Sequence, residues 1–187
     1  MRVFVALDIP DEVRANLSAL RAKLERACPE ARWARVEGLH VTLKFIGEIS
    51  SEKVEQIQAR LATIRSAMPV EMSFRGAGWF PSERRPRVFW VGITATSNLA
   101  EIAAEVERQL EPLGIPREQR PFWPHLTLAR FDPEKGVERL QKAVRESGSL
   151  EFGSTRTGEL HLYQSRLKPA GAEYTRLATF FFVEGAR

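Results

Sequence analysis

Apolar residues recur along the chain at the spacing that places them on one face of a helix. Four stretches carry them at intervals of three or four positions, as amphipathic helices do. The four stripes are Val13, Leu17, Leu20 and Leu24, then Val54, Ile57, Leu61 and Ile64, then Leu99, Ile102, Val106 and Leu110, and finally Val137, Leu140 and Val144. We therefore predict four helices, each with its stripe against a core.

Capping and breaking residues set the limits of these helices. Ser and Asp favour helix starts, whereas Gly favours helix ends and Pro either starts a helix or stops it. In chain order the limiting residues are Pro10 at the first start, Ser50 or Ser51 at the second, Pro112 and Gly114 at the third end, and Asp132-Pro133 at the fourth start.

Apolar runs and alternating stretches between the helices predict strands. They cover residues 2–7, 40–46, 70–74, 88–94, 125–131, 150–152, 158–164 and 174–183. Glycine and proline predict a loop over residues 76–81 and a turn over 165–172, and residues 33–38 form a connection or a short strand. Strands and helices are interleaved without a Ser/Gly linker, so we expect one α+β domain over residues 1–187, with mostly antiparallel sheets.

Two of the predicted strands open with the same pattern, His-apolar-Thr-Leu. They are His40-Val41-Thr42-Leu43 and His125-Leu126-Thr127-Leu128, which hold two of the three histidines. In a strand the His and Thr of each pattern share one face. An Arg-Val-Phe triplet stands 38 residues before each His, since 40 − 2 and 125 − 87 both equal 38. An offset of 85 thus relates residues 2–80 to 87–165, which predicts an internal repeat with a pseudo-twofold axis between the motif strands.

Composition and charge add few restrictions. The chain is 43% hydrophobic and 28% charged, as ordinary globular proteins are. A net charge of +4 permits an anionic partner such as RNA without requiring one. Cys28 is the single cysteine, which excludes an internal disulfide and fits a reducing compartment. With no apolar run of about 18 residues, we expect a cytoplasmic protein without a membrane partner. We also expect a monomer.

The paired motifs suggest acid–base chemistry on a phosphate. A neutral imidazole can take a proton from water while a protonated one gives a proton to a departing oxygen. Two threonine hydroxyls suit phosphoryl oxygens, so such a site could open a cyclic phosphodiester. The chain has no His-x-x-x-His spacing, no cysteine cluster and no Gly-x-Ser-x-Gly segment. These gaps disfavour a metal site and a serine triad, and we predict neither a metal nor a cofactor.

Several segments resemble the two-histidine phosphoesterase superfamily, and within it the RNA 2′,3′-cyclic phosphodiesterases, historically called 2′-5′ RNA ligases. The similarity spans nearly the whole chain. It lies in residues 2–10 (RVFVALDIP), 39–48 (LHVTLKFIGE) and 124–130 (PHLTLAR), and in Ser165, Gly171 and Tyr174 of the last segment.

The resemblance implies a bilobal fold in which two mostly antiparallel sheets, flanked by helices, place the active site in a central cleft. It also implies metal-independent hydrolysis of RNA ends that carry a 2′,3′-cyclic phosphate, tRNA fragments among them, to 2′-phosphates. By the family's pattern His40 matches the proton donor to the leaving 3′ oxygen, and His125 the base that activates water. Thr42 and Thr127 match the phosphate-binding hydroxyls.

Arg130 matches an arginine that family members place at the ligand. A regular strand would turn Arg130 to the face opposite His125. Either the strand ends or bulges by Ala129, or Arg130 acts from the side.

Other interpretations remain open at this point. The same residues would suit a cyclic phosphodiesterase of small nucleotides or a non-catalytic module that binds the 2′-phosphate of RNA ends, and ligation of RNA ends would be the reverse reaction. The histidines can also be structural, and threonine is common in strands. His161 has no threonine two positions on and is predicted to be an ordinary strand residue. Several further side chains could either contact RNA or have an ordinary role in the core or at the solvated surface. They are Trp79, Trp90, Trp123, Arg84, Arg85, Arg87, Arg166 and Lys168.

Overall fold

A computed structural model describes residues 1–132, 136–168 and 171–183 of the chain. Its helices are α1 (Asp11–Ala27), α2 (Ser51–Leu61), α3 (Asn98–Leu110) and α4 (Val137–Arg145), with short 3-10 turns at Val36–Gly38 and Glu111–Leu113. Its strands are β1 (Arg2–Leu7), β2 (Arg32–Trp33), β3 (Val41–Glu48), β4 (Val70–Phe80), β5 (Val88–Ala95), β6 (His125–Arg130), β7 (Glu151–Thr157), β8 (Glu159–Lys168) and β9 (Gly171–Phe181). None of these described helices has the length and apolar character needed to cross a membrane.

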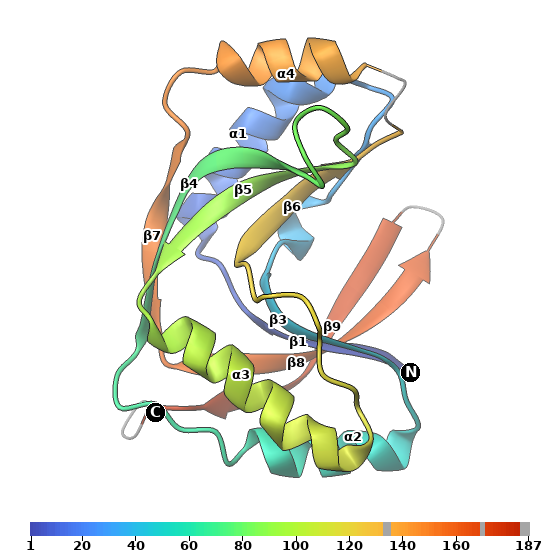
Figure 1. The fold of residues 1–187 in the computed structure, drawn as a ribbon, viewed down its shortest axis with the longest axis vertical. Coiled ribbons are helices and arrows are strands. Elements are labelled where there is room, and N and C mark those ends of the chain that lie inside the picture. Colours follow the sequence, from blue (N-terminus) through green and yellow to red (C-terminus); the bar gives the residue numbers. More distant parts are fainter. Residues whose placement is uncertain (133–135, 169–170, 184–187) are drawn as a thin grey trace.

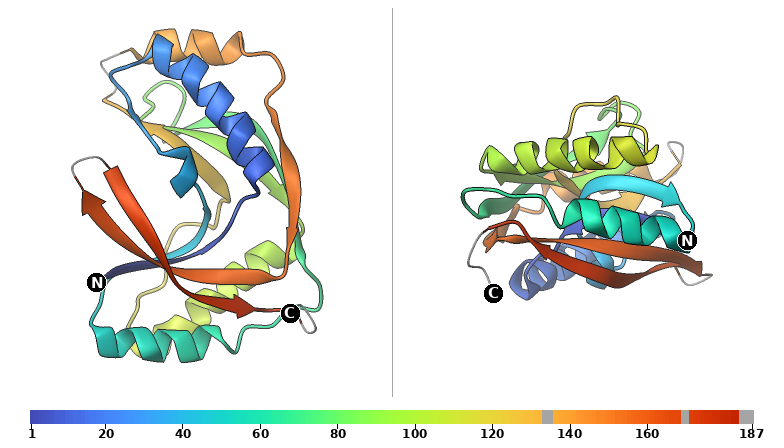
Figure 2. Two further views of the ribbon diagram at one scale, coloured as in Figure 1. Left: turned by 180° about the vertical axis from the view of Figure 1, so that it is seen from behind. Right: turned by 90° about the horizontal axis from the view of Figure 1, so that it is seen from below.

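The strands form two antiparallel sheets, which confirms the predicted α+β class. The first sheet has the order β3-β1-β8-β9, and the second has the order β2-β6-β5-β4-β7. Figure 1 shows the second sheet arching over the first, with α1 and α4 at one end of the molecule and α2 and α3 at the other. The view from behind in Figure 2 shows the same arrangement. The helices therefore cover the outer surfaces, and the inner surfaces of the sheets face each other.

The two halves of the repeat exchange elements. An offset of 85 carries β1 and β3 onto β5 and β6, and it carries the bounds of β4 onto residues 155–165, most of which lie in β8. The order β3-β1-β8 thus repeats as β6-β5-β4, with the third strand of each half in the other half's sheet. Likewise α1 follows β1 but packs against β7, and α3 follows β5 but packs against β3. This exchange brings β3 and β6, the strands that follow or contain the motif histidines, into contact.

The predicted helix stripes are largely buried. Val13, Leu17, Leu20 and Leu24 of α1 all lie in the core. Ser50 caps α2 by accepting a hydrogen bond from the backbone N–H of Lys53 at 3.4 Å. The fourth helix begins at Val137, later than predicted; Pro133, part of its predicted start, lies outside the described residues.

Two predicted loops are strands instead. β4 continues through residues 76–80 because Gly76, at φ 72°, takes up a bulge and Gly78 leaves room for the Trp90 ring. A side chain at Gly78 would overlap that ring. Most of the predicted turn at 165–172 is ladder, since β8 runs to Lys168 and β9 starts at Gly171. The exposed ends of β8 and β9 carry a weak apolar pattern, so the sequence alone did not reveal that they continue as strands.

A buried ion pair ties β3 to α3. The Lys44 ammonium donates to Glu107 Oε2 at 2.7 Å and to the backbone carbonyl of Pro116 at 2.6 Å. Both side chains are largely buried, with 5% of Lys44 and 17% of Glu107 exposed. This pair holds the outer side of the strand that follows His40.

Removing the carboxylate of this pair is expected to destabilise the fold. Glu107→Ala leaves a buried ammonium without its partner, so we expect the free energy of unfolding to fall by about 3–5 kcal/mol. Denaturant titration measures this change. The matched control is Glu111→Ala, because Glu111 pairs with Arg117 at the surface and both side chains are about half exposed. We expect this control to cost less than about 1 kcal/mol. Equal losses in the two variants would contradict the assignment.

Candidate active site

Both motif histidines are held by the same backbone contact. His40 Nδ1 lies 2.7 Å from the carbonyl oxygen of Gly38, and His125 Nδ1 lies 2.7 Å from that of Trp123. A carbonyl oxygen only accepts, so each Nδ1 carries a proton and donates it. Within the described residues neither Nε2 has a hydrogen-bond partner. Each Nε2 is therefore left to accept a proton when the ring is neutral or to donate one when it is charged.

Aromatic rings fix the plane of each imidazole. Phe4 stacks on His40 with ring centroids 4.4 Å apart, and Tyr174 meets His40 edge-on at 5.1 Å. Phe80 meets His125 edge-on at 5.0 Å, and Trp90 lies 6.3 Å from it. The rings around His40 come from the first sheet and those around His125 from the second, so each sheet positions its own histidine.

The motif threonines lie two residues beyond their histidines, on β3 and β6. Thr42 and Thr127 are both partly exposed between buried apolar neighbours, as the alternation of a strand predicts. In the described part of the chain neither hydroxyl has a hydrogen-bond partner. Both are therefore available to a ligand.

A bulge follows each threonine and turns the next part of the strand over. The β1–β3 register skips Leu43, and the β5–β6 register skips Leu128, its equivalent at an offset of 85. Leu128 and Ala129 are consecutively buried and Arg130 is exposed, so Arg130 lies on the same face as His125. The sequence left open whether the strand ends or bulges by Ala129 or whether Arg130 acts from the side, and the structure shows a bulge.

The equivalent of Arg130 in the first half is Phe45. Its ring is 69% exposed and lies 6.1 Å from Phe4, the residue that stacks on His40. The two halves therefore present different chemistry at the same position, an apolar ring beside His40 and a cation beside His125. The repeat offset could have identified Phe45 from the sequence, once Arg130 had been singled out.

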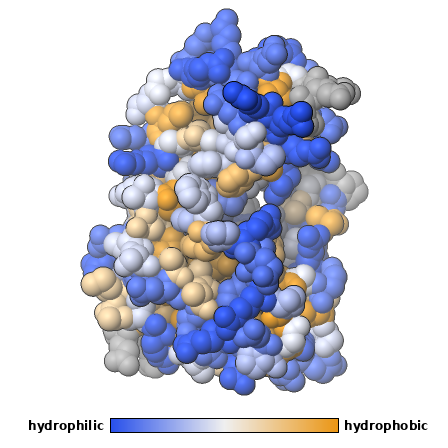
Figure 3. Space-filling model, in the orientation of Figure 1, coloured by the Kyte–Doolittle hydropathy of each residue, from blue (hydrophilic) through white to orange (hydrophobic). Residues whose placement is uncertain are grey.

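Arg130 links the two halves electrostatically. Its charge lowers the pKa of His125 and is also felt by Tyr174 of the first sheet, where burial is the larger effect and raises the pKa. The Tyr174 ring in turn contacts His40. Arg130 of the second sheet therefore acts on a residue of the first sheet, Tyr174, that contacts His40. Figure 3 shows apolar and weakly polar surface over part of the middle of the molecule's face, beside a strongly hydrophilic band.

The two histidines differ in the charges around them. Burial is the main cause that lowers the pKa of each ring, and the carbonyl bonded to Nδ1 opposes it. Beyond these shared causes, the Asp8 carboxylate raises the pKa of His40 and Arg14 lowers it. At His125 the additional charge is Arg130, which lowers the pKa. The acid near His40 thus favours the protonated form there, and the cation near His125 favours the neutral form.

Asp8 belongs to a hydrogen-bonded group that the sequence did not reveal. It accepts from the Tyr163 hydroxyl at 2.5 Å and pairs with Arg176. Burial and Asp8 raise the pKa of Tyr163 to about 12, so its hydroxyl stays a donor. His161, fully buried in β8, lies with Nε2 3.6 Å from Asp8 and Nδ1 3.0 Å from the Thr179 hydroxyl. No local pattern marked this group, because its members come from three separate strand regions.

The other side chains whose role the sequence left open differ in their exposure and contacts in the structure. Trp79 packs against Phe89 with ring centroids 4.8 Å apart, on the core side, whereas Trp123 is 62% exposed next to His125. Lys168 pairs with Glu173 across the β8–β9 hairpin at 2.6 Å. Arg84, Arg85, Arg87 and Arg166 are all exposed.

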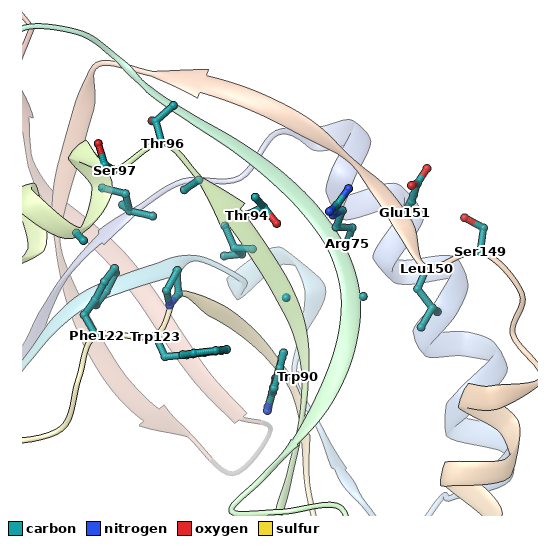
Figure 4. A pocket seen from close by; sticks show the side chains of 17 residues that line it. Arg75, Trp90, Thr94, Thr96, Ser97, Phe122, Trp123, Ser149, Leu150 and Glu151 are labelled. Carbon is teal, nitrogen blue, oxygen red and sulfur yellow. The ribbon is translucent and has the colours of Figure 1, made fainter.

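A pocket of about 690 Å³ opens beside His125. Trp90, Gly92 and Thr94 of β5 line it, together with Trp123 and the first turn of α3 (Figure 4). Separately, no three His, Cys, Asp or Glu side chains of residues 1–132, 136–168 and 171–183 converge as metal ligands would.

Comparison with known proteins shows a family match and relatives that share one name. The sequence model described as LigT-like phosphoesterase matches twice, at residues 7–90 and 91–174, as expected for a duplicated unit. The RNA 2′,3′-cyclic phosphodiesterase of Methanothermobacter thermautotrophicus is 32% identical over 181 residues, which cover 96% of this chain and 98% of the relative. The enzyme of the same name from Aeropyrum pernix is 38% identical over 163 residues, covering 87% and 92%.

Solved structures show the same fold. A crystal structure of a Thermus thermophilus protein superposes with a TM-score of 0.80 at 30% identity, covering 98% of this chain and 100% of the other. The structure of Escherichia coli LigT in complex with 3′-AMP superposes with a TM-score of 0.77 at 28% identity, covering 98% of each chain.

Proposed function

The chain belongs to the LigT-like phosphoesterase family, and we propose that it hydrolyses the 2′,3′-cyclic phosphate of RNA ends to a 2′-phosphate without a metal ion. The observation that carries this proposal is the duplicated contact at Nδ1, which leaves Nε2 of both His40 and His125 free to move a proton. The names of the curated relatives support the substrate class.

In the proposed reaction the cyclic phosphate lies between the two imidazoles. Neutral His125 takes a proton from water through Nε2, and the water oxygen forms a bond to phosphorus. The bond from phosphorus to the 3′ oxygen breaks in line with this attack, and protonated His40 gives its proton to that oxygen. The 2′-phosphate remains. The reaction leaves His125 protonated and His40 neutral, and proton exchange with solvent restores the starting state.

The remaining site residues stabilise charge on the phosphate. Thr42 and Thr127 donate hydroxyl protons to the non-bridging oxygens, and Arg130 compensates the negative charge that develops there. Of the charges that the structure describes nearby, an acid is present only beside His40, where Asp8 favours the proton against Arg14, whereas Arg130 disfavours it on His125; this difference supports the division of roles.

Further features of the proposal concern the substrate and its context. We infer that tRNA fragments are among the substrates and that the protein acts as a monomer in the cytoplasm. A 5′-hydroxyl in place of water would join two RNA ends through a 2′-5′ bond by the same proton transfers. The mononucleotide complex of the Escherichia coli relative favours small cyclic nucleotides as a second substrate class.

Product analysis tests the proposal. An oligonucleotide with a 2′,3′-cyclic phosphate end is expected to give the 2′-phosphate alone, at a rate that excess EDTA leaves unchanged. A 3′-phosphate product, or loss of turnover in EDTA that added metal restores, would contradict the mechanism. Tight binding with no product after long incubation would instead favour a binding module. Rates on cyclic mononucleotides and on oligonucleotides, measured side by side, separate the two substrate classes.

A further inference from the structure

The backbone of His40 is held differently from that of His125. His125 is the first residue of β6 and pairs with Gly92 across the β5–β6 ladder, so the sheet fixes its backbone. His40 stands just before β3, which begins at Val41, and the pairing of β3 with β1 also ends at Val41. The position of His40 therefore depends on the segment that leads into the strand.

This segment crosses from one sheet to the other. It leaves β2 in the second sheet, forms the 3-10 turn Val36–Gly38 and enters β3 in the first sheet, as the left view of Figure 2 shows. Gly38, the last residue of the turn, supplies the carbonyl oxygen that accepts from His40 Nδ1 at 2.7 Å. The position of the turn therefore decides where the His40 ring points.

Arg14 of α1 holds the turn. Its Nη1 donates to the carbonyl oxygens of Val36 and Glu37, both at 2.9 Å. The side chain is mostly enclosed, with 22% of it exposed. The helix α1 packs in turn against β7, a strand of the second sheet. Arg14 thus ties the turn before His40 to the sheet that carries His125.

The charge of Arg14 does not favour a proton donor beside it. This charge lowers the pKa of His40, and a lower pKa leaves less of the ring protonated at neutral pH. Any benefit to catalysis must therefore come from geometry. Phe4 stacks on His40 with ring centroids 4.4 Å apart, but a stacked ring can still turn within its own plane. The bond from Nδ1 to the Gly38 carbonyl decides which nitrogen is presented to a substrate.

The second half holds its equivalent carbonyl with prolines. This carbonyl belongs to Trp123, which lies between Pro121 and Pro124. Proline restricts its own φ and the backbone of the residue before it. At the repeat offset of 85 neither proline has a counterpart in the first half, and the counterpart of Arg14 is Leu99, a buried core residue. The arginine and the prolines are therefore alternative means of fixing one carbonyl.

We propose that Arg14 is a positioning residue for His40. By holding the turn it fixes the Gly38 carbonyl, which keeps Nδ1 in place and directs Nε2 at the leaving 3′ oxygen. The proposal rests on the proposed function, in which His40 is the acid.

Arg14→Met tests this role, because methionine keeps an apolar side chain and loses the donor. We expect kcat for cyclic-phosphate hydrolysis to fall about 10–10²-fold, as it does when a reacting group is slightly misplaced, and KM to stay within about twofold. Loss of charge alone would act the other way, since it raises the pKa of His40. Arg21→Met is the matched control. Arg21 lies on the same helix, is 26% exposed and pairs with Glu25 within the helix, so we expect its kcat to be unchanged.

Nitrogen-15 NMR of the imidazoles reports the orientation of His40 without turnover. The chain has three histidines, and the spectrum of His40→Ala identifies the signals of His40. Neutral His40 is expected to carry its proton on Nδ1 in the wild type and in Arg21→Met. In Arg14→Met part of the population is expected to move to the form protonated on Nε2, with the His125 signals unchanged.

The proposal requires both changes, in kcat and in the His40 tautomer, and requires them in Arg14→Met but not in Arg21→Met. If either change is absent, or if the control shows both, the positioning role is wrong and the proposed function stands. Arg14→Gln, whose shorter amide does not reach both carbonyls, gives the same two readouts if Arg14→Met does not fold. If wild-type protein leaves the cyclic phosphate intact, the proposed function fails, and with it the acid that Arg14 positions.

Discussion

Replacing His125 by alanine is expected to lower kcat for cyclic-phosphate hydrolysis by about 10²–10⁴-fold, the usual contribution of a positioned general base or acid. His125 Nδ1 is already committed to the Trp123 carbonyl, so no other nitrogen of the ring can replace Nε2 as the base. His40→Ala is expected to cost a similar factor through the loss of the acid. Steady-state kinetics on one oligonucleotide measures both effects.

The double variant adds a sharper requirement. When two groups take part in the same catalytic step, the rate losses from removing each one do not add. We therefore expect the double variant to be little slower than the slower single variant. Thermal unfolding monitors the fold, since both rings are only partly buried and their removal leaves the core intact. Full activity in either folded single variant would contradict paired-histidine catalysis. Additive losses would indicate that the two rings act independently.

The sequence predicted the geometry of the motif strands better than that of their surroundings. Spacing alone identified His40 and His125, and the strand alternation placed Thr42 and Thr127 on the same faces as their histidines. These features are local, and a strand's two-residue period expresses them directly. The helix stripes are equally local, which explains why the buried residues of α1 matched those predicted.

What the sequence left open depends on contacts between distant strands. The bulge at Leu128, which decides where Arg130 points, is defined only by the register against β5. The group around Asp8 forms only because β8 pairs with β1 in the exchanged sheet. No periodicity within a segment records which strand from the other half will become its neighbour, so strand order could not be derived.

Replacing Arg130 by methionine is expected to have two separable effects. Loss of a cation at the phosphate is expected to lower kcat/KM by about 10²–10³-fold, as removal of a transition-state donor does. The second effect concerns pH. The positive charge of Arg130 lowers the pKa of His125, so its removal raises that pKa. Because the proposed base must be neutral, activity falls as pH drops through this pKa, and the acid limb of the kcat/KM profile should move to higher pH.

Phe45→Ala provides the matched comparison, because Phe45 occupies the same position of the repeat on the His40 side and carries no charge. We expect this variant to affect substrate binding and to leave the acid limb in place. Arg130→Lys distinguishes charge from shape, since lysine keeps the charge but loses the planar donor geometry of the guanidinium. In Arg130→Lys the acid limb of the kcat/KM profile should stay close to its wild-type pH, while kcat/KM itself still falls. The two limbs report apparent pKa values of the coupled pair of histidines, so the comparison uses the shift between variants. An acid limb that stays fixed in Arg130→Met, or moves to lower pH, would mean that His125 is not the base on which Arg130 acts.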